Sequence, residues 1–271
     1  MGYAALFGIL AGAMIAYPSE AARAASDALG LWAGAIAPVL GPFMACMLMI
    51  VSRLPVRPWA RVLLSWLCGS PGGAKLMRAA GVSGRSALRM AAMTGTMSPM
   101  FFLGTLSGWL GDPAAARLML ICHLLGALAL GLCIPAGKAA SGPPPVPMPL
   151  AVALKDTALA LLTVAGCMML GSVAARMAAC ALPALSPDVS AGLQCLLEIT
   201  AGVKALIARG SPFTVPLACA ACSFGGLSLL MQNAAFWQEG GVGMGTLCLL
   251  RALHGVLSGT LCFLALQLPG L

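Results

Sequence analysis

Two glycine-rich segments that each carry a lysine constrain the fold of this largely apolar chain more than any other feature. The first reads Gly69-Ser70-Pro71-Gly72-Gly73-Ala74-Lys75, and the second reads Glu198-Ile199-Thr200-Ala201-Gly202-Val203-Lys204. A shift of 129 residues superimposes Lys75 on Lys204 and carries residues 94–99 onto residues 223–228 without a gap. A charge at membrane depth costs about 3 kcal/mol on insertion scales, so it marks a functional site by default. Matched lysines in two halves favour a transporter-like inverted repeat with a central site.

The composition indicates an all-α integral membrane protein. Hydrophobic residues make up 61% of the chain, charged residues only 8%, and the mean hydropathy is +0.99. Soluble domains carry about 25% charged residues. Several apolar segments approach the ~20 residues that a membrane-spanning helix needs. The net charge of +8 does not indicate nucleic-acid binding, because the basic residues form no solvated basic domain and no known motif.

The order of apolar segments predicts two similar halves. We expect crossings at residues 29–52, 90–110, 114–135, 152–176, 213–236 and 244–267, after a short first span at 2–17. Residues 62–80, broken by glycines, and residues 190–210 are expected to form helical hairpins that dip into the membrane and return. The predicted organisation is a first span and loop (1–28), repeat 1 (29–136), a proline-rich cytoplasmic linker (137–150) and repeat 2 (151–271).

The placement of basic residues predicts the orientation, because cytoplasmic loops are enriched in Lys and Arg. One side of the predicted layout carries Arg53, Arg57, Arg61, Arg78, Arg85, Arg89, Lys138 and Lys155. The other side carries Arg23, Arg117, Arg176 and Arg209. We therefore expect a multi-pass protein of the bacterial cytoplasmic membrane with its N-terminus inside and its C-terminus outside. The two hairpins then enter from opposite faces, as inverted repeats require.

Four segments, at residues 70–75, 94–104, 197–204 and 223–232, resemble segments of YlbJ-type sporulation integral membrane proteins, which belong to the nucleoside-recognition, or Gate, group. Residues 70–75 are similar to the GYPxGAK-like segment of that family, with Ser70 in place of its tyrosine, and residues 94–104 to its NxSGPxFxxG-like segment. Residues 197–204 are similar to its LEITxG segment, and residues 223–232 to its FGGLSxxxQ segment. The resemblance implies a hairpin-containing fold related to concentrative nucleoside transporters. It also implies a permease for a small molecule such as dipicolinic acid.

The candidate substrate site gathers the hairpin tips and the polar breaks that follow them. Broken helices persist in a membrane only where they are buried in protein or line a wet cavity, and helix N-termini favour anions there. The residues expected to bind substrate are Ser70, Gly72, Gly73, Lys75, Thr94, Thr96, Ser98, Thr200, Gly202, Lys204, Ser223, Gly225, Gly226, Ser228, Gln232 and Asn233. We expect a small anionic, dipicolinate-like carboxylate.

Three charged residues have alternative interpretations. Glu198 is interpreted as the only carboxylate within a predicted membrane segment. It is expected to pair with Lys204, to carry a coupling proton or to bind a cation. Lys75 and Lys204 bind the substrate in the main interpretation, and in the alternative they extend from the hairpin feet to the membrane interface.

Other residue patterns argue against further chemistry. The eleven cysteines are an odd number scattered through apolar segments, so they predict no disulfide framework. Residues 219–222 have CxxC spacing without a second pair, which favours buried thiols over a metal site. His123 and His254 are expected to pack or to form helix–helix hydrogen bonds rather than to relay protons. No catalytic arrangement is present, so we expect neither an enzyme nor a cofactor.

Two other functions remain open at the level of sequence. A nucleoside transporter would recognise a neutral substrate mainly through Ser, Thr, Gln and Asn side chains. A non-transporting membrane scaffold or sporulation assembly factor would have a dry, packed interior. Gly126, Gly131 and Gly171 fit close helix packing, within the chain or in a homo-oligomer.

Overall fold

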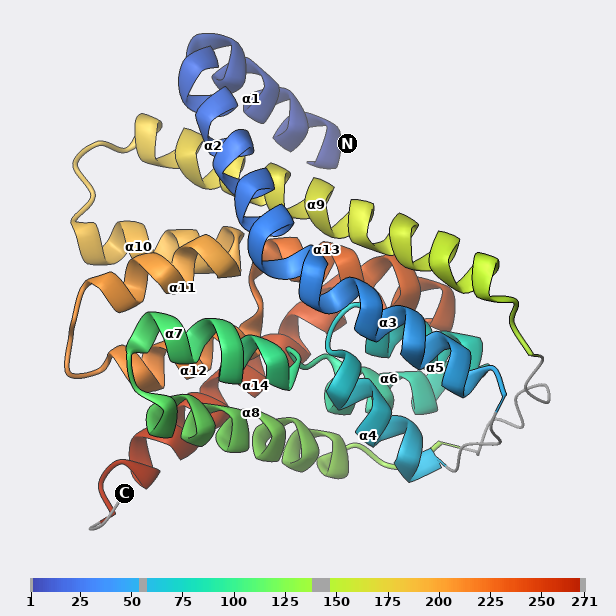
Figure 1. The fold of residues 1–271 in the computed structure, drawn as a ribbon. Helices are drawn as coiled ribbons and strands as arrows, with labels where there is room; N and C mark the ends of the chain where they lie inside the picture. Colours follow the sequence, from blue (N-terminus) through green and yellow to red (C-terminus); the bar gives the residue numbers. More distant parts are fainter. Residues whose placement is uncertain (1, 54–57, 138–146, 269–271) are drawn as a thin grey trace.

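The computed structural model describes residues 2–53, 58–137 and 147–268, and every element in these ranges is a helix (Figure 1). The helices are α1 (Gly2–Ala16), α2 (Pro18–Leu31), η1 (Trp32–Ile36), α3 (Ala37–Val51), α4 (Pro58–Cys68), α5 (Gly72–Ala79), α6 (Gly84–Thr94), η2 (Phe101–Leu106), α7 (Ser107–Leu110), α8 (Pro113–Cys133), α9 (Leu150–Ala181), α10 (Pro187–Leu197), α11 (Ile199–Ala208), α12 (Thr214–Phe224), α13 (Gly226–Trp237), η3 (Gln238–Gly240) and α14 (Met244–Ala265).

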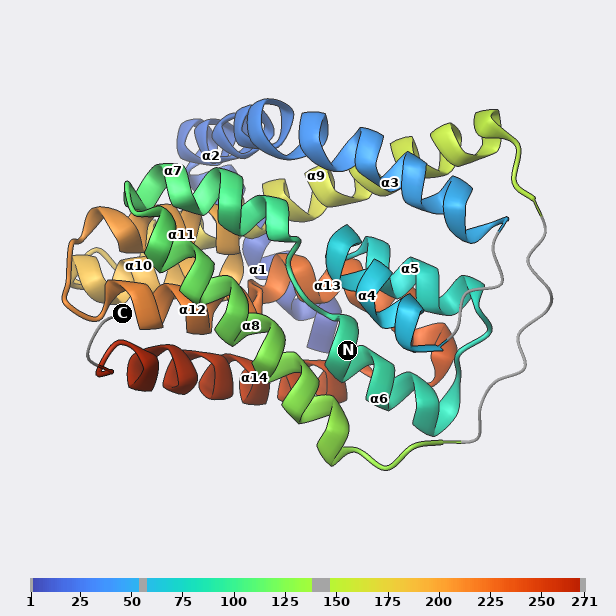
Figure 2. The same cartoon turned by 60° about the horizontal axis from the view of Figure 1, so that its bottom comes forward.

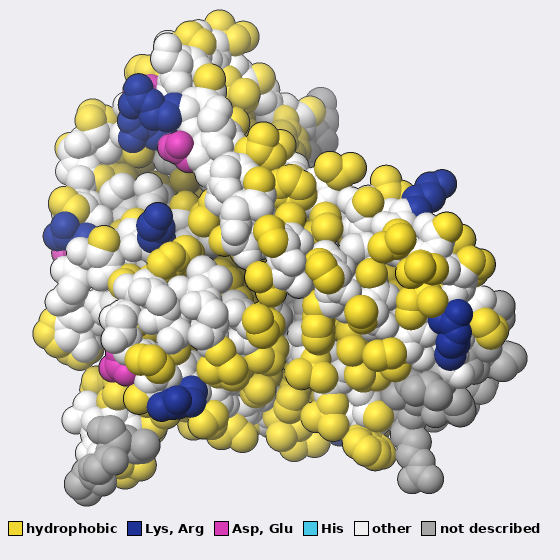
Figure 3. Space-filling view, viewed as in Figure 1, with side chains coloured by type: hydrophobic (Ala, Val, Ile, Leu, Met, Phe, Trp, Pro, Cys, Tyr) yellow, Lys and Arg dark blue, Asp and Glu magenta, His cyan; other side chains and the backbone are white. Residues whose placement is uncertain are grey.

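Five of these helical stretches are long and apolar enough to cross a membrane. They are Pro18–Val51, Pro113–Cys133, Leu150–Ala181, Thr214–Gly240 and Met244–Ala265. Figure 3 shows basic side chains near the left and right margins of the molecule, with hydrophobic side chains exposed between them. Such an apolar surface is solvated by lipid rather than by water. The chain is therefore an all-α, multi-pass membrane protein.

The two halves of the chain contain corresponding elements in the same order. The first half has the continuous helix 18–51, the adjacent short helices α4 and α5, an interrupted stretch from α6 to α7, and α8. The second half has α9, the adjacent short helices α10 and α11, an interrupted stretch from α12 to α13, and α14. We call α4–α5 hairpin 1 and α10–α11 hairpin 2. Their closed ends face the middle of the molecule from opposite sides (Figures 1 and 2).

Local sequence explains where several of these helices begin. Asp112 accepts hydrogen bonds from the backbone N–H groups of Ala114 (2.9 Å) and Ala115 (3.0 Å) and so caps α8. Ser186 caps α10 in the same way. In both helices a proline occupies the first helical turn, where its missing N–H is not needed.

The interruptions in the second membrane stretch of each half have different backbone causes. In the first half, α6 ends at Thr94 and helix resumes only near Phe101. In the second half, Gly225 (φ 86°) and Gly226 (φ 68°) separate α12 from α13. These positive φ values are strained for any residue with a Cβ, so glycine is strongly favoured there.

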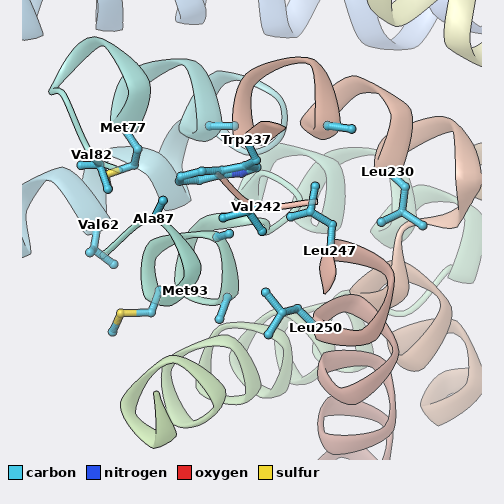
Figure 4. Close-up of a cluster of buried hydrophobic side chains, with 14 residues drawn as sticks. Val62, Met77, Val82, Ala87, Met93, Leu230, Trp237, Val242, Leu247 and Leu250 are labelled. Carbon is cyan, nitrogen blue, oxygen red and sulfur yellow. The ribbon is translucent and has the colours of Figure 1, made fainter. Parts of the chain in front are cut away.

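The main apolar core joins the two halves near hairpin 1. Trp237 of α13 is buried in one cluster with side chains from α4, α5, α6 and α14, among them Val62, Met77 and Leu250 (Figure 4). A second core cluster surrounds Phe102, which is fully buried. These clusters bring the two interrupted stretches together.

One expectation differs from the structure, one is confirmed, and one lies largely outside the described residues. Residues 18–28 were expected in a loop but form α2, because Pro18 starts a new alanine-rich helix as well as ending α1. The polar break expected at residues 94–99 within the crossing 90–110 is present, because α6 ends at Thr94 and η2 begins at Phe101. Most of the linker 137–150 lies outside the described residues, as do Arg57 and Lys138, which contributed to the predicted orientation.

Candidate functional site

A central cavity of about 80 Å³ lies where the two hairpin tips and both helix interruptions meet. Its polar lining comes from Ser70, Ser98, Thr105, Glu198, Thr200, Ser228 and Gln232. Helix 18–51 and α9 complete the wall with apolar side chains, including Ala35 and Val164. The space is sufficient for several water molecules. Gln232 lines this space, and its Oε1 atom is buried without a hydrogen-bond partner.

Each hairpin tip contacts the interruption in its own half. The Ser70 backbone N–H donates to the Thr96 carbonyl oxygen at 2.7 Å, which fixes hairpin 1 against the interruption after α6. In the second half, a Cβ on Gly226 would lie 2.8 Å from the Cys195 carbonyl oxygen. Only glycine permits hairpin 2 to approach this closely. Both tips are therefore held by backbone contacts at the cavity.

Glu198 occupies the N-terminus of α11 and is 1% exposed. Its carboxylate accepts hydrogen bonds from the backbone N–H groups of Thr200 (3.0 Å) and Ala201 (2.7 Å). These bonds satisfy donors that have no partner within the helix, and the positive end of the helix dipole stabilises the anion. Among the interpretations open for Glu198, pairing with Lys204 is not observed, because the carboxylate binds backbone N–H groups instead.

A larger cavity of about 880 Å³, here called the vestibule, lies between α2, α9 and hairpin 2. In Figure 1, α2, hairpin 2 and the C-terminal part of α9 lie toward the left of the molecule. Its charged lining residues are Arg23, Asp27, Arg176, Glu198 and Lys204. Arg176 pairs with Glu20, and Arg23 lies 3.8 Å from the same carboxylate. Glu198 lines the vestibule as well as the central cavity, so its side chain lies between the two spaces.

Lys75 does not line the central cavity. Its Nζ lies 3.2 Å from Oδ2 of Asp156 and donates to the Asp156 backbone carbonyl at 3.3 Å. Asp156 belongs to α9, a candidate membrane span. The interpretation of Glu198 as the only carboxylate in a membrane segment is therefore wrong. Asp156 lies near the start of the predicted crossing 152–176, and spacing along the sequence gave no sign that Lys75 would meet it.

Lys204 also lies outside the central cavity, on the wall of the vestibule. It is exposed there, and its Nζ lies 5.9 Å from the centre of the Trp109 ring, within range of a cation–π interaction. No ion pair involving Lys204 is found in the described residues. The two matched lysines thus occupy different electrostatic environments.

The other predicted site residues divide into three groups. Ser70, Ser98, Thr200, Ser228 and Gln232 line the cavity. Thr94, Thr96, Ser223 and Asn233 are buried beside it; Thr94 and Asn233 donate to carbonyl oxygens of their own helices, and Thr96 Oγ1 has no partner. Gly72, Gly73, Gly202, Gly225 and Gly226 provide close packing or positive φ.

Arg251 of α14 holds the interruption after α6, a role that the sequence did not reveal. The side chain is 3% exposed, and its guanidinium donates to the carbonyl oxygens of Ala91 (3.0 Å), Ala92 (2.9 Å) and Gly95. These carbonyls have no partners at the C-terminal end of a helix, where a cation is favourable. An arginine within the predicted crossing 244–267 was the available signal, as intramembrane charges are rare.

Two histidines extend this network between the halves. His254 Nε2 contacts the His123 carbonyl oxygen (2.8 Å), and its Nδ1 faces Arg251 (3.2 Å). A carbonyl only accepts and a guanidinium only donates, so we assign the proton of His254 to Nε2. His123 Nε2 accepts from the Met97 N–H (3.0 Å), which assigns its proton to Nδ1, facing Ser223 Oγ (2.7 Å). The expected helix–helix hydrogen bonds are therefore present.

Comparisons with known proteins provide no functional assignment. Family models, curated proteins and solved structures give no significant match to this chain. The described residues contain no group of three His, Cys, Asp or Glu side chains that could hold a metal ion. The functional proposal must therefore come from the cavities and their lining.

Proposed function

We propose that the chain is a membrane permease that moves a small carboxylate-bearing molecule between the two hairpin tips. The observation that carries the proposal is the position of Glu198, whose carboxylate separates a wide vestibule from a polar central cavity. A cavity with unpartnered polar atoms is unfavourable in a protein that only needs to pack. A non-transporting scaffold would gain nothing from this arrangement.

An inverted repeat supports the same proposal. The shift of 129 residues pairs positions that line the central cavity: Ala35 with Val164, Val39 with Met168, Ser70 with Ile199, and Met100 with Leu229. An inverted repeat whose axis passes through the cavity would relate these positions to one another, so the pairings support the proposal. A site on such an axis can be opened alternately to either side by related movements of the two halves. The similarity to YlbJ-type and Gate proteins points in the same direction.

The N-terminus of α11 favours an anionic substrate. Glu198 already shows that a carboxylate fits the N–H groups of Thr200 and Ala201. A substrate carboxylate would replace it there, and Lys204, one helical turn further along α11, would attract the substrate from the vestibule. Two carboxylates cannot share these donors while both are charged. Glu198 therefore leaves the helix end, or takes up a proton, when the substrate arrives.

Transport by purified protein in sealed liposomes tests this proposal. We expect uptake of pyridine-2,6-dicarboxylate and related small carboxylates, and little uptake of the corresponding neutral diamide. Protein-free liposomes provide the background. Uptake of uridine with no uptake of carboxylates would favour the nucleoside alternative, in which hydroxyl and amide side chains recognise the substrate. Absence of flux for all three classes would contradict the permease.

A further inference from the structure

The lysine and aspartate that form the Lys75–Asp156 ion pair have counterparts in the opposite halves of the chain. The 129-residue shift relates Lys75 to Lys204, and it also relates Asp27 to Asp156. In each combination the lysine lies on the second helix of a hairpin, and the aspartate lies on the first long helix of the other half. Each combination therefore connects the two halves.

The two combinations are in different states. Lys75 and Asp156 are in contact at 3.2 Å, with side chains 21% and 33% exposed. Lys204 and Asp27 both line the vestibule, and neither forms an ion pair with any described residue. The other two cations that line the vestibule, Arg176 and Arg23, both form ion pairs with Glu20. Lys204 and Asp27 thus remain as partners for one another.

The residues around the two lysine–aspartate combinations also differ in exposure: they are accessible near Lys204 and buried near Lys75. Gln194 and Ala205 line the vestibule beside Lys204. Their counterparts in the first half, Ser65 and Leu76, are 0% and 3% exposed. The Oγ atom of Ser65 is buried without a hydrogen-bond partner, which is costly unless the position becomes hydrated in another state. Corresponding positions are therefore open in one half and closed in the other.

We infer that Lys75–Asp156 and Lys204–Asp27 are two alternating gates, of which only one is closed at a time. In the present state the first gate is closed and the vestibule admits solute to Glu198. In the alternate state Lys204 and Asp27 pair across the vestibule, Lys75 and Asp156 separate, and Leu76 lines a new opening. The inference rests on the proposed permease and its inverted repeat, and it specifies which side chains select the open side. Ion pairs of similar strength at both gates keep the two states close in free energy, as alternating access requires.

Reciprocal protection of two cysteines tests the inference without any substrate. Ala205→Cys reports on the vestibule, and Leu76→Cys reports on the closed side. Each variant is reconstituted in nanodiscs, where both faces are accessible, and is treated with a charged maleimide. Peptide mass spectrometry then follows the rate at that one residue, so the native cysteines do not interfere. In the native background we expect rapid labelling at 205 and slow labelling at 76.

Removing each ion pair should change the two labelling rates in opposite directions. Lys75→Met with Asp156→Asn weakens the closed gate, so labelling should rise about fivefold or more at 76 and fall at 205. Lys204→Met with Asp27→Asn weakens the alternate state, so labelling at 76 should fall further. The matched control is Arg209→Gln with Asp188→Asn, which removes a 2.7 Å ion pair within hairpin 2 that does not join the halves. The control should leave both rates unchanged.

Unchanged rates in both gate variants would overturn the inference, as would equal changes in the control. The exchange Lys75→Asp with Asp156→Lys retains an ion pair and should restore the native rates. If the Lys75/Asp156 removal variant does not fold, the Lys204/Asp27 variant still decides, because both of its residues are exposed. Reciprocal changes in labelling without carboxylate flux would support the two gates and contradict the proposed carboxylate substrate. Carboxylate flux without reciprocal changes in labelling would support the permease function and contradict the two gates.

Discussion

Hairpin 1 and hairpin 2 occupy corresponding places in the two halves but carry different chemistry. Hairpin 1 turns at Gly69–Pro71, and its lysine is neutralised by Asp156. Hairpin 2 turns at Glu198, whose carboxylate caps α11, and its lysine faces an open vestibule. A repeated order of elements therefore fixes where the tips meet without fixing the electrostatics at each tip. In a transporter, this difference corresponds to one closed side and one open side.

The helix interruptions extend the comparison and predict the largest effect. The first interruption is held by the buried Arg251, whereas the second depends on glycine backbone conformations. Arg251→Met leaves three carbonyl oxygens and His254 Nδ1 unpaired, which should cost more than about 4 kcal/mol of unfolding free energy. Gly225→Ala should cost only about 1–2 kcal/mol from its positive φ. Denaturant titration in mixed micelles measures both values, with the exposed Arg117→Met as control. Equal losses of unfolding free energy in the two variants would show that the two interruptions do not differ in how they are stabilised.

A smaller loss is expected when the hairpin 1 lysine is removed. Lys75→Met leaves Asp156 without its partner in a half-buried site, and we expect a loss of about 1.5 kcal/mol. Adding Asp156→Asn should recover part of the loss, since no unpaired charge then remains. A double-mutant cycle in the same titration gives the coupling between the two side chains. A coupling free energy near zero would mean that the Lys75–Asp156 contact does not stabilise hairpin 1, so the two lysines would not differ in this respect.

Glu198→Gln should cost about 1 kcal/mol, because an amide retains one acceptor for the Thr200 and Ala201 N–H groups but loses the charge. The same variant resembles the protonated side chain, so the pH dependence of carboxylate uptake should be reduced. Uptake measured between pH 5.5 and 8 in liposomes checks this expectation. A pH profile identical to that of the native protein would show that Glu198 does not carry a coupling proton.

The smallest effect on stability is expected at Lys204. Lys204→Met removes an exposed, unpaired charge, so the unfolding free energy should change by less than about 0.5 kcal/mol. The KM for a carboxylate should rise severalfold, because Lys204 attracts the substrate from the vestibule, and kcat should fall as well, because the variant cannot form the ion pair of the alternate state. Concentration-dependent uptake separates the two quantities. A large loss of stability would instead place Lys204 in a structural role like that of Lys75.

The sequence predicted the helical elements better than the side-chain contacts. Apolar segment lengths, glycine-rich breaks and the polar stretch at residues 94–99 indicated both short-helix pairs and both interruptions, because these features depend on local backbone chemistry. The Lys75–Asp156 contact and the carbonyl bonds of Arg251 join residues far apart in the chain, so they depend on packing that no local pattern encodes. The 129-residue shift already contained the match between Asp27 and Asp156. That match could be interpreted as part of a second ion pair only after the structure showed the contact between Lys75 and Asp156.

The central claim is that solute passes through the cavity between the hairpin tips, and blocking that cavity tests it most directly. Ala35 lines the cavity from η1, whereas Ala33, on the same short segment, is exposed on the outer surface. Ala35→Phe should fill most of the space, and Ala33→Phe introduces the same side chain elsewhere. In matched liposomes, we expect carboxylate uptake to fall at least tenfold in Ala35→Phe and to remain near the native rate in Ala33→Phe. Native uptake by a folded Ala35→Phe variant would contradict this route.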